Sequence, residues 1–235
     1  MNQNRCSILR DVFFFGLIAV FSSGVIFAAD ANQQSDLTKR LTESSKVLNQ
    51  IMATPDKAIP SGIIQRARCV AVFPSTVQVA VLVGAKHGKG FVTCRTAKGW
   101  SAPAPLDISG GSWGAQLGGE EVDLVMVITD SKGEQQLESG KFDLGTETSV
   151  TAGPVGNHAM TMNADVLSYS RTRGVFAGTN VNGSSMTQDK DETKTLYGSP
   201  VSLADILSGK VSRPDAGKPF LESVKQYAGE TKPKD

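Results

Sequence analysis

The sequence predicts an α+β fold rich in β structure, with an antiparallel barrel-like or strongly curved sheet, an N-terminal amphipathic helix and short C-terminal helices. Three observations carry this prediction. Apolar, β-branched runs separated by turn residues fill the middle of the chain, as in antiparallel sheets. Glycines interrupt these runs, above all between residues 88 and 128, and glycine inside a strand marks a bend or a bulge. Near both ends, apolar residues recur with a helical period.

The N-terminal residues have the pattern of a secretory signal peptide. Arg5 and Arg10 precede an apolar run over 12–28, and small residues follow it, so we expect a signal peptide over 1–29. An uncleaved membrane anchor is the alternative, although the run is shorter than the roughly 20 apolar residues that a spanning helix needs. We therefore expect an exported protein, periplasmic or peripherally associated with the envelope.

The net charge of the chain argues against a general attraction to nucleic acid. Cleavage after Ala29 removes two of the 24 basic residues and one of the 23 acidic residues, which leaves 22 of each. A neutral chain lacks the electrostatic footprint of a nucleic-acid-binding protein, so nucleic acid is not an expected partner. Contact with an anionic surface must then come from local clusters of basic residues.

The elements are expected in the following order. A helix over 35–52 either packs by its apolar stripe or lies in a membrane interface, where Lys39, Arg40 and Lys46 meet anionic headgroups. Short strands joined by tight turns at 74–75 and 86–89 follow it, and the apolar run over 122–128 predicts a strand buried on both faces. The predicted early strands cover 69–73, 77–83 and 90–96; later strands cover 142–150, 164–172 and 175–181; short helices cover 60–67, 131–139, 190–197, 203–207 and 220–227. We expect one domain over 30–228 and a disordered tail over 229–235.

Few residues suggest site chemistry. Cys69 and Cys94 are expected to form a disulfide, because paired cysteines in an exported protein are commonly bridged. With only two histidines in the chain, no metal site and no cofactor are expected. Arg171 and Arg173 occupy alternate strand positions and so share one face, as a headgroup site or as solvated edge charges.

Catalysis is a remote alternative. The residues Gly110-x-Ser112-x-Gly114 match the nucleophile elbow of serine hydrolases, and Asp143 and His158 follow in the order that a triad needs. The elbow requires a helix directly after the serine, whereas the glycine-rich residues after Ser112 have poor helix propensity. The sequence therefore predicts that the protein is not an enzyme.

Six motifs, in order, resemble the SYLF domain family: Ala71-Val72-Phe73-Pro74, Gly88-Lys89-Gly90, Gly99-Trp100-Ser101-Ala102-Pro103, Gly110-Gly111-Ser112-Trp113-Gly114, Gly153-Pro154-Val155-Gly156 and the run 169–178. The resemblance covers about residues 36–210. It implies lipid binding by an amphipathic helix at the start of the domain and by basic surface residues, here Lys39, Arg40 and Lys46. Eukaryotic members bind phosphoinositides, and fungal members bind actin, whereas this chain resembles the exported bacterial branch.

One departure from the family pattern bears on the ligand. Where the family commonly has Lys-Ala-Gly-Phe, this chain has Gln78-Val79-Ala80-Val81, so a basic contact is lost. An exported bacterial protein meets anionic phospholipid and not actin, so actin is not expected as a partner. The leading hypothesis is a non-enzymatic domain that contacts anionic phospholipid headgroups of the phosphoinositide type at a membrane surface. A structural or protein-partner module of the cell envelope is the alternative; the oligomeric state is left open.

Overall fold

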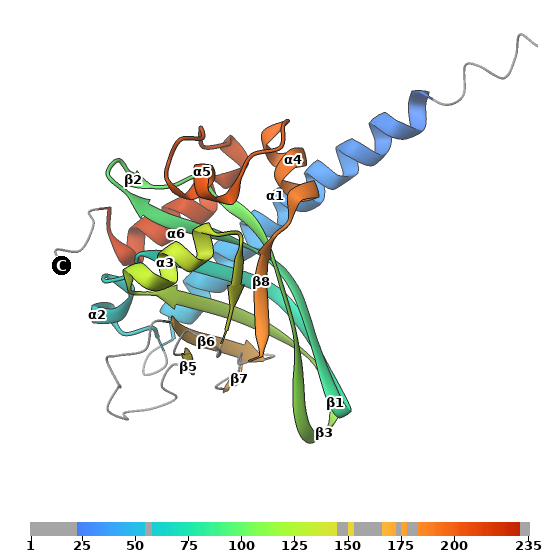
Figure 1. Cartoon of the computed structure of the whole chain (residues 1–235), viewed down its shortest axis with the longest axis vertical. Helices are drawn as coiled ribbons and strands as arrows, with labels where there is room; N and C mark the ends of the chain where they lie inside the picture. The colour runs from blue at the N-terminus through green and yellow to red at the C-terminus, as the bar shows by residue number, and fades with distance from the viewer. Residues whose placement is uncertain are drawn as a thin grey trace, which may run out of the picture.

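The computed structural model describes residues 23–54, 58–144, 150–152, 166–172, 175–177 and 183–230. Helices lie mainly at the two ends of the chain, and strands lie between them (Figure 1). The helices are α1 (Ser23–Met52), α2 (Ser61–Ile64), α3 (Ser131–Glu138), α4 (Lys190–Tyr197), α5 (Leu203–Leu207), the 3-10 turn η1 (Asp215–Gly217) and α6 (Lys218–Ala228). The strands are β1 (Cys69–Thr96), β2 (Gly99–Trp100), β3 (Ala104–Ile128), β4 (Lys141–Asp143), β5 (Val150–Ala152), β6 (Val166–Thr172), β7 (Val175–Ala177) and β8 (Ser184–Gln188).

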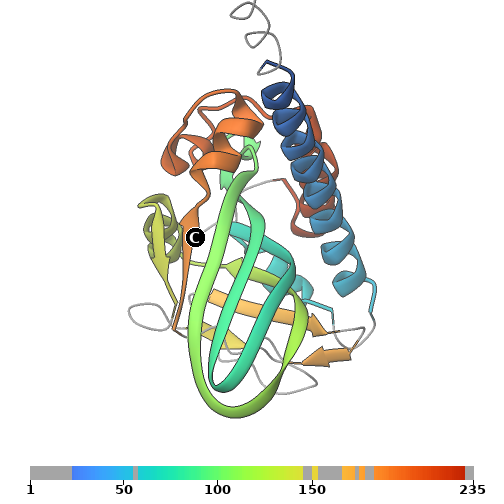
Figure 2. The ribbon, with the colours of Figure 1, turned by 90° about the vertical axis from the view of Figure 1, so that its right-hand side faces the viewer.

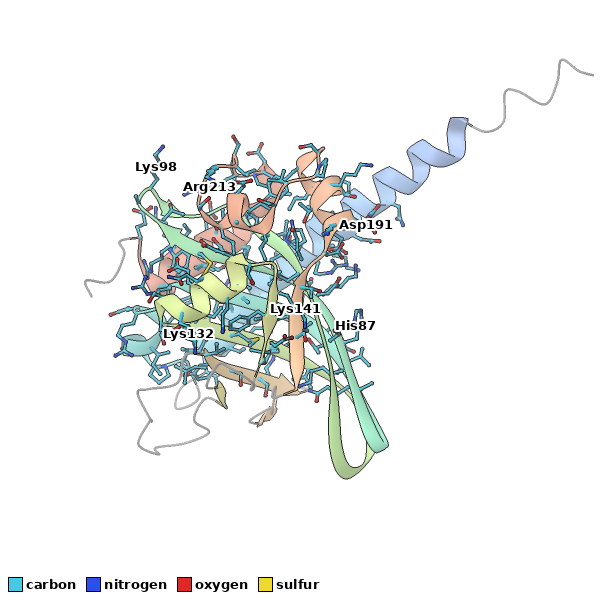
Figure 3. All side chains as sticks on the ribbon, in the orientation of Figure 1. His87, Lys98, Lys132, Lys141, Asp191 and Arg213 are labelled. Atoms are coloured by element: carbon cyan, nitrogen blue, oxygen red, sulfur yellow. A yellow bond between two sulfur atoms is a disulfide. The ribbon has the colours of Figure 1, made fainter. Side chains whose placement is uncertain are left out.

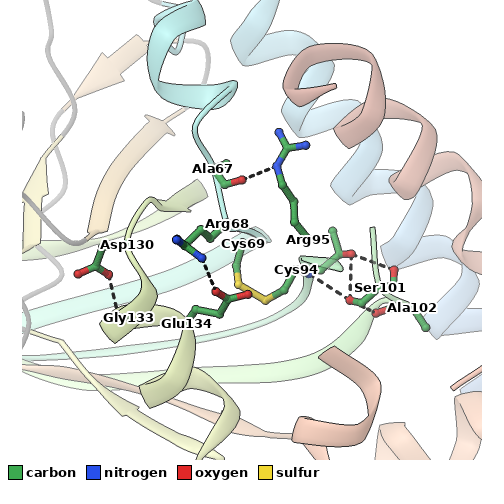
Figure 4. Close-up of a disulfide and its surroundings, with 11 residues drawn as sticks. Ala67, Arg68, Cys69, Cys94, Arg95, Ser101, Ala102, Asp130, Gly133 and Glu134 are labelled. Carbon is green, nitrogen blue, oxygen red and sulfur yellow. Dashed lines mark hydrogen bonds and ion pairs between the residues drawn. A yellow bond between two sulfur atoms is a disulfide. The ribbon is translucent and has the colours of Figure 1, made fainter. Parts of the chain in front are cut away.

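The sheet is organised around one long ribbon made of β1 and β3. The two strands pair antiparallel from Cys69 opposite Ile128 to Val92 opposite Ala104. The ribbon is folded back on itself, so that its bent middle projects from the body of the molecule (Figure 2). As a result the two ends of β1 meet: Cys69 and Cys94, 25 positions apart, are joined by a disulfide, with their Cα atoms 4.0 Å apart (Figure 4).

The prediction of three short strands over 69–96 is wrong, because this segment is the single strand β1. Residues 74–75 form a bulge, marked by a register shift between Phe73 and Thr76, and residues 86–89 pair with β3 throughout. The two halves of β1 pass very close to each other: a Cβ on Gly90 would lie 2.2 Å from the Val72 carbonyl oxygen. The glycine there serves this close approach and not a turn.

The remaining strands extend the ribbon on both sides. β6 and β8 pair antiparallel with opposite halves of β3, β4 pairs with β8, and β7 pairs with β6. Together they form an eight-stranded, strongly curled sheet, which confirms the predicted fold class. One pairing departs from the antiparallel prediction, since β5 runs parallel to β6.

Apolar residues cover both faces of the sheet. Because side chains alternate along a strand, the odd positions of β1 before its bulge and the even positions at the end of β3 face the concave side, where they pack with Phe142, Leu106 and Ile108. The alternate positions face α1 and α6. Residues 124–128 are all buried, so the prediction of a strand covered on both faces is confirmed. Large buried side chains thus fill the concave side.

Helix α1 packs on the convex side of the sheet. Its apolar stripe is buried, with Leu37, Leu41, Leu48 and Ile51 each at most 1% exposed. It contacts α6, where the Ser45 and Ser223 hydroxyls lie 2.6 Å apart in a buried hydrogen bond. The helix predicted over 35–52 is confirmed, although α1 begins at Ser23 and so runs across the expected cleavage position after Ala29. Among the described residues, the helices are too short or too polar to cross a membrane.

The C-terminal helices follow their sequence signals. Ser202 caps α5 by accepting a hydrogen bond from the Asp205 backbone N–H at 3.1 Å, and Gly209 ends that turn with a φ of +79°. Strand β8 was missed, because it falls between the predicted strand over 175–181 and the predicted helix over 190–197. Residues 1–22, which hold most of the predicted signal peptide, lie outside the described residues, as do His158, Arg173 and residues 231–235 of the predicted tail.

Candidate functional site: a charged groove between α1 and the ribbon

An open groove of about 670 Å³ lies between the outer side of α1, the bulge of β1 at Pro74 and Ser75, and the neighbouring parts of β3 and β6. Its lining is mainly charged. The basic lining residues are Lys39, Arg40, Lys46 and Arg171, and the acidic ones are Asp36, Glu43, Glu121 and Asp123. The groove thus carries four charges of each sign.

The structure brings together four of the five basic residues singled out in the sequence. Lys39, Arg40 and Lys46 share one helix, and Arg171 comes from β6, about 130 positions along the chain. The fifth residue, Arg173, lies outside the described residues. The sequence did not predict the convergence of α1 and β6, because no local pattern relates segments so far apart in the chain.

Ion pairs fix several of these side chains. The Arg171 guanidinium donates to Asp123 at 2.6 Å, and the same carboxylate accepts the Ser75 backbone N–H at 3.2 Å. Lys46 pairs with Glu43 at 2.8 Å along the exposed face of α1. Within the described part of the chain Lys39 makes no ion pair, and its side chain is exposed. Lys39 and Lys46 are therefore the basic groups that solvent and ligands reach most freely.

A partly buried charge cluster, here called the Lys89 cluster, includes Arg40 of the groove; its members are Arg40, Lys89, Asp107, Asp189 and Glu192. Arg40 donates to Glu192 at 2.5 Å, and Lys89 donates to Glu192 at 3.0 Å and also to Asp189. The two acceptor carboxylates are almost fully buried, at 6% and 8% exposure. The cluster ties α1 to β1 and to the start of α4.

Burial and charge shift two pKa values in the Lys89 cluster. Burial lowers the pKa of Lys89, but hydrogen bonds to Asp189 and Glu192 outweigh it, so the pKa lies above its ordinary value. Burial raises the pKa of Asp107, and the nearby charge of Asp189 raises it further. The sequence analysis predicted a turn at Lys89 and therefore missed this cluster. The one sequence feature that marks the position is the pair of flanking glycines, Gly88 and Gly90, which allow β1 to pass close to itself.

Arg95 is a fully buried cation on the opposite side of the disulfide from α3 (Figure 4). It is 3% exposed, lies 4.4 Å from the centre of the Trp100 ring, and donates to backbone carbonyls of Gln65, Ala67, Ala228 and Gly229. The Trp100 indole N–H also donates to Gly229, at 2.7 Å. Arg95 and Trp100 thus cap the C-terminus of α6, where a cation is favourable.

The local backbone does not support the hydrolase reading. Ser112 lies inside β3, opposite Gly84 of β1, whereas a nucleophile elbow needs a strand that turns into a helix. Asp143 accepts a hydrogen bond from the Ser185 hydroxyl at 2.5 Å, and His158 lies outside the described residues. No group of three or more histidine, cysteine or acidic side chains suited to a metal ion occurs in the described part of the chain.

The curled sheet, the packed α1 and the outer groove define an α+β protein of half-barrel type whose charged site lies on the surface. Sequence comparison then matches residues 109–227 to the family described as Ysc84, Las17-binding protein actin regulator. This match covers half of the 235 residues, and the chain belongs to this family, which is the SYLF family that its motifs resemble.

Curated relatives extend the similarity beyond the matched segment. SH3 domain-containing YSC84-like protein 1 from Bos taurus and from Homo sapiens are each 31% identical over 205 residues, which cover 82% of this chain and 60% of theirs. Protein YSC84 from Saccharomyces cerevisiae is 30% identical over 189 residues, or 77% of this chain and 40% of its own. The chain thus spans about three fifths of the mammalian relatives that it matches. The family description names actin regulation. These comparisons therefore do not support the expectation that actin is not a partner.

Proposed function

We propose that this chain is an exported, non-enzymatic binding domain that contacts anionic phospholipid headgroups through the groove beside α1. The observation that carries the proposal is the convergence of Lys39, Arg40, Lys46 and Arg171 on one open groove from two distant parts of the chain. A headgroup phosphate is an anion of the kind that clustered lysine and arginine side chains bind.

The ion pairs specify how a headgroup would be held. Arg171 is fixed by Asp123, and Arg40 by Glu192, so these two guanidinium groups are already oriented. Lys39 and Lys46 are exposed at the surface of α1 and supply the mobile contacts. The four carboxylates of the groove repel highly charged ligands, which favours a headgroup with one phosphate over a multiply phosphorylated one. The absence of the family lysine at Gln78 favours the same choice.

This mode of binding leaves α1 in its place. The apolar stripe of α1 is buried against the sheet and α6, so inserting residues 37–51 into a membrane would expose the core of the protein. The proposal therefore assigns headgroup contact to the outer, polar side of the helix.

Export and the absence of catalysis have separate support. The basic and apolar pattern over 1–29 is typical of a signal peptide, and the disulfide between Cys69 and Cys94 suits an oxidising compartment. The position of Ser112 within β3, together with a relative named for binding, LAS seventeen-binding protein 3, favours a binding function over hydrolysis.

Vesicle co-sedimentation tests the headgroup proposal. The double variant Lys39→Ala/Lys46→Ala should bind anionic vesicles about 30-fold more weakly, since each lysine contributes about 1 kcal/mol at an anionic surface. A matched control is Lys98→Ala/Lys132→Ala, which removes two exposed lysines outside the groove (Figure 3). Equal loss in both variants would mean that overall charge and not the groove binds the lipid. A wild-type protein that binds neither anionic nor neutral vesicles would overturn the proposal.

A protein-partner module is the second candidate, and two observations favour it. The groove carries balanced charges, which suit a polypeptide segment of mixed charge, and the apolar stripe of α1 is fully used inside the fold. LAS seventeen-binding protein 3 of Saccharomyces cerevisiae is a relative named for a protein partner, at 29% identity. Retention of the mature chain by a protein of the envelope, lost in Lys39→Ala/Lys46→Ala but without vesicle binding, would favour this candidate.

A further inference from the structure

The bulge of β1 interrupts the ladder directly beside the groove. The register with β3 shifts between Phe73 and Thr76. Pro74 and Ser75 together therefore lie opposite the single residue Asp123. A bulge that sets two residues against one takes backbone groups out of the regular ladder. Here the Ser75 N–H donates to the Asp123 side chain at 3.2 Å, so the bulge presents a backbone donor to a residue that lines the groove.

Ser75 is held in a backbone conformation that glycine usually adopts. Its φ is +57°, and it is the only non-glycine residue with a positive φ in the part of the chain that the structure describes. The left-handed conformation is unfavourable for a residue that carries a side chain, and residues strained in this way are concentrated at functional sites. Because Ser75 lines the groove, the strain lies at the candidate site and not in a remote turn.

The Asp123 carboxylate lies between two donors that come from different strands. One of its oxygens accepts the Ser75 N–H from β1, and the other accepts the Arg171 guanidinium from β6 at 2.6 Å. Arg171 lies directly opposite Asp123 where β6 pairs with β3, so both neighbours of the central strand contribute a donor. The Arg171 and Asp123 side chains are 22% and 19% exposed, and both line the groove.

The two donors around Asp123 are of the kind that binds phosphate. A guanidinium and a backbone N–H that converge on one point form charge-assisted hydrogen bonds with phosphate oxygens. A carboxylate offers these donors two oxygens that share one negative charge, and a phosphate group offers oxygens of the same kind. Asp123 thus occupies a position suited to a phosphate, and it keeps both donors aimed at one point of the groove.

We infer that Asp123 holds the place of a ligand phosphate: on binding, the phosphate takes over the Ser75 N–H and the Arg171 guanidinium, and the carboxylate turns out into the open groove. This inference rests on the proposed function and adds a position for the phosphate. Because the phosphate must displace a charged competitor, the apparent affinity falls with the fraction of molecules in which the position is open. An anion must therefore gain further contacts, for example with Lys46 of the same groove. A headgroup at a membrane surface gains such contacts more readily than a free anion.

Neutralising Asp123 tests the displacement. The variant Asp123→Asn keeps the shape of the side chain and an oxygen that can accept the Ser75 N–H, but it no longer competes as an anion. The control Glu121→Gln removes one carboxylate from the same strand and the same groove. Asp123→Asn should bind phosphatidylglycerol vesicles about tenfold more tightly than Glu121→Gln, since both variants lose one charge and only the first opens the position. Equal, measurable affinities of the two variants, with folding checked by circular dichroism, would overturn the inference and leave the headgroup proposal standing.

Soluble phosphate separates the two possible sources of the ligand and identifies the donors. Inorganic phosphate added to Asp123→Asn should shift the NMR signal of the Ser75 amide. The double variant Asp123→Asn/Arg171→Gln, which lacks the guanidinium, should show no shift. A shift in Asp123→Asn without vesicle binding by any of the proteins would support the displacement and refute the headgroup proposal. A Ser75 signal that responds to neither phosphate nor vesicles in Asp123→Asn, or that responds equally in the double variant, would overturn the inference.

Discussion

Two cations, the buried Arg95 and the partly buried Lys89, show how single residues organise this fold. Arg95 donates to backbone carbonyls that α2 and α6 leave at their ends, and its five N–H donors suit such a set of acceptors. Lys89, in contrast, is a point charge surrounded by carboxylates. The chemistry of each site matches its cation, which predicts that the two residues respond differently to substitution.

Replacing Arg95 should destabilise the protein even by a change that keeps the charge. Arg95→Ala leaves buried carbonyls of Ala67 and Ala228 without a donor and exposes one side of Trp100, so we expect a loss of about 3 kcal/mol in unfolding free energy. Arg95→Lys should recover only part of this loss, because one ammonium group cannot reach all four carbonyls. Urea denaturation followed by circular dichroism measures both. Full recovery by lysine would show that charge alone matters here.

Lys89 should make stability depend on pH in the alkaline range. Its pKa is raised in the folded state, so its contribution is complete below the pKa of the unfolded chain and is lost as pH rises through the folded pKa. Lys89→Met should cost about 2 kcal/mol at neutral pH, a value reduced for the partial exposure of Lys89. The difference between wild type and variant should be constant from neutral pH upward and then shrink above about pH 10.4. A constant difference across the whole range, measured by urea titration, would contradict this assignment.

At the scale of elements, α1 has two faces with different tasks. Its apolar stripe belongs to the core, and its outer face carries Lys39 and Lys46 at the groove. The sequence could predict the helix and its basic residues, because a periodic pattern reports which side is apolar. The sequence left open whether the apolar side of α1 faces the protein core or a membrane, since both environments are low in polarity. The answer depends on α6 and the sheet, which pack there from distant parts of the chain.

Locking α1 to α6 distinguishes groove binding from release of the helix. The Ser45 and Ser223 hydroxyls are 2.6 Å apart, so the double variant S45C/S223C should form a disulfide on oxidation. Because headgroup contact uses the outer face of α1, the locked protein should bind anionic vesicles as tightly as the uncrosslinked control S45A/S223A. Vesicle flotation provides the comparison. Loss of binding only in the locked protein would show that α1 must leave the core in order to bind lipid.

The β1–β3 ribbon is the element that sequence reasoning described least well. Pro74-Ser75 and the glycines after residue 83 are turn residues by local rules, which led to three short strands where there is one. The local sequence pattern shows the bulge and the glycines, but it does not show which backbone the glycines lie against. The two halves of β1 meet only because the ribbon folds back. The glycine-rich motif was correctly assigned to bent strands, whereas the distance between its two ends depends on tertiary contacts.

At the scale of the whole molecule, the candidate site is assembled from signals that the sequence carries separately. The basic residues of α1 and Arg171 were each visible, and the structure places them in one groove. Their acidic neighbours were not selected, because scattered carboxylates have no recognisable spacing. Yet Glu43 and Asp123 set the balance of charge in the groove and the orientation of its basic groups. The ligand preference therefore depends on acidic residues that no sequence motif marks.

If the groove binds lipid through its charged side chains, the affinity for anionic vesicles should fall as salt rises, because exposed charges are screened. Lys39 and Lys46 are the exposed basic groups of the groove, so Lys39→Ala/Lys46→Ala should lose part of this salt dependence. The control Lys98→Ala/Lys132→Ala leaves the groove intact and should keep the salt dependence of the wild type. Vesicle titrations of the three proteins at low and at high salt measure the effect. An equal salt dependence in all three would mean that charges outside the groove hold the lipid.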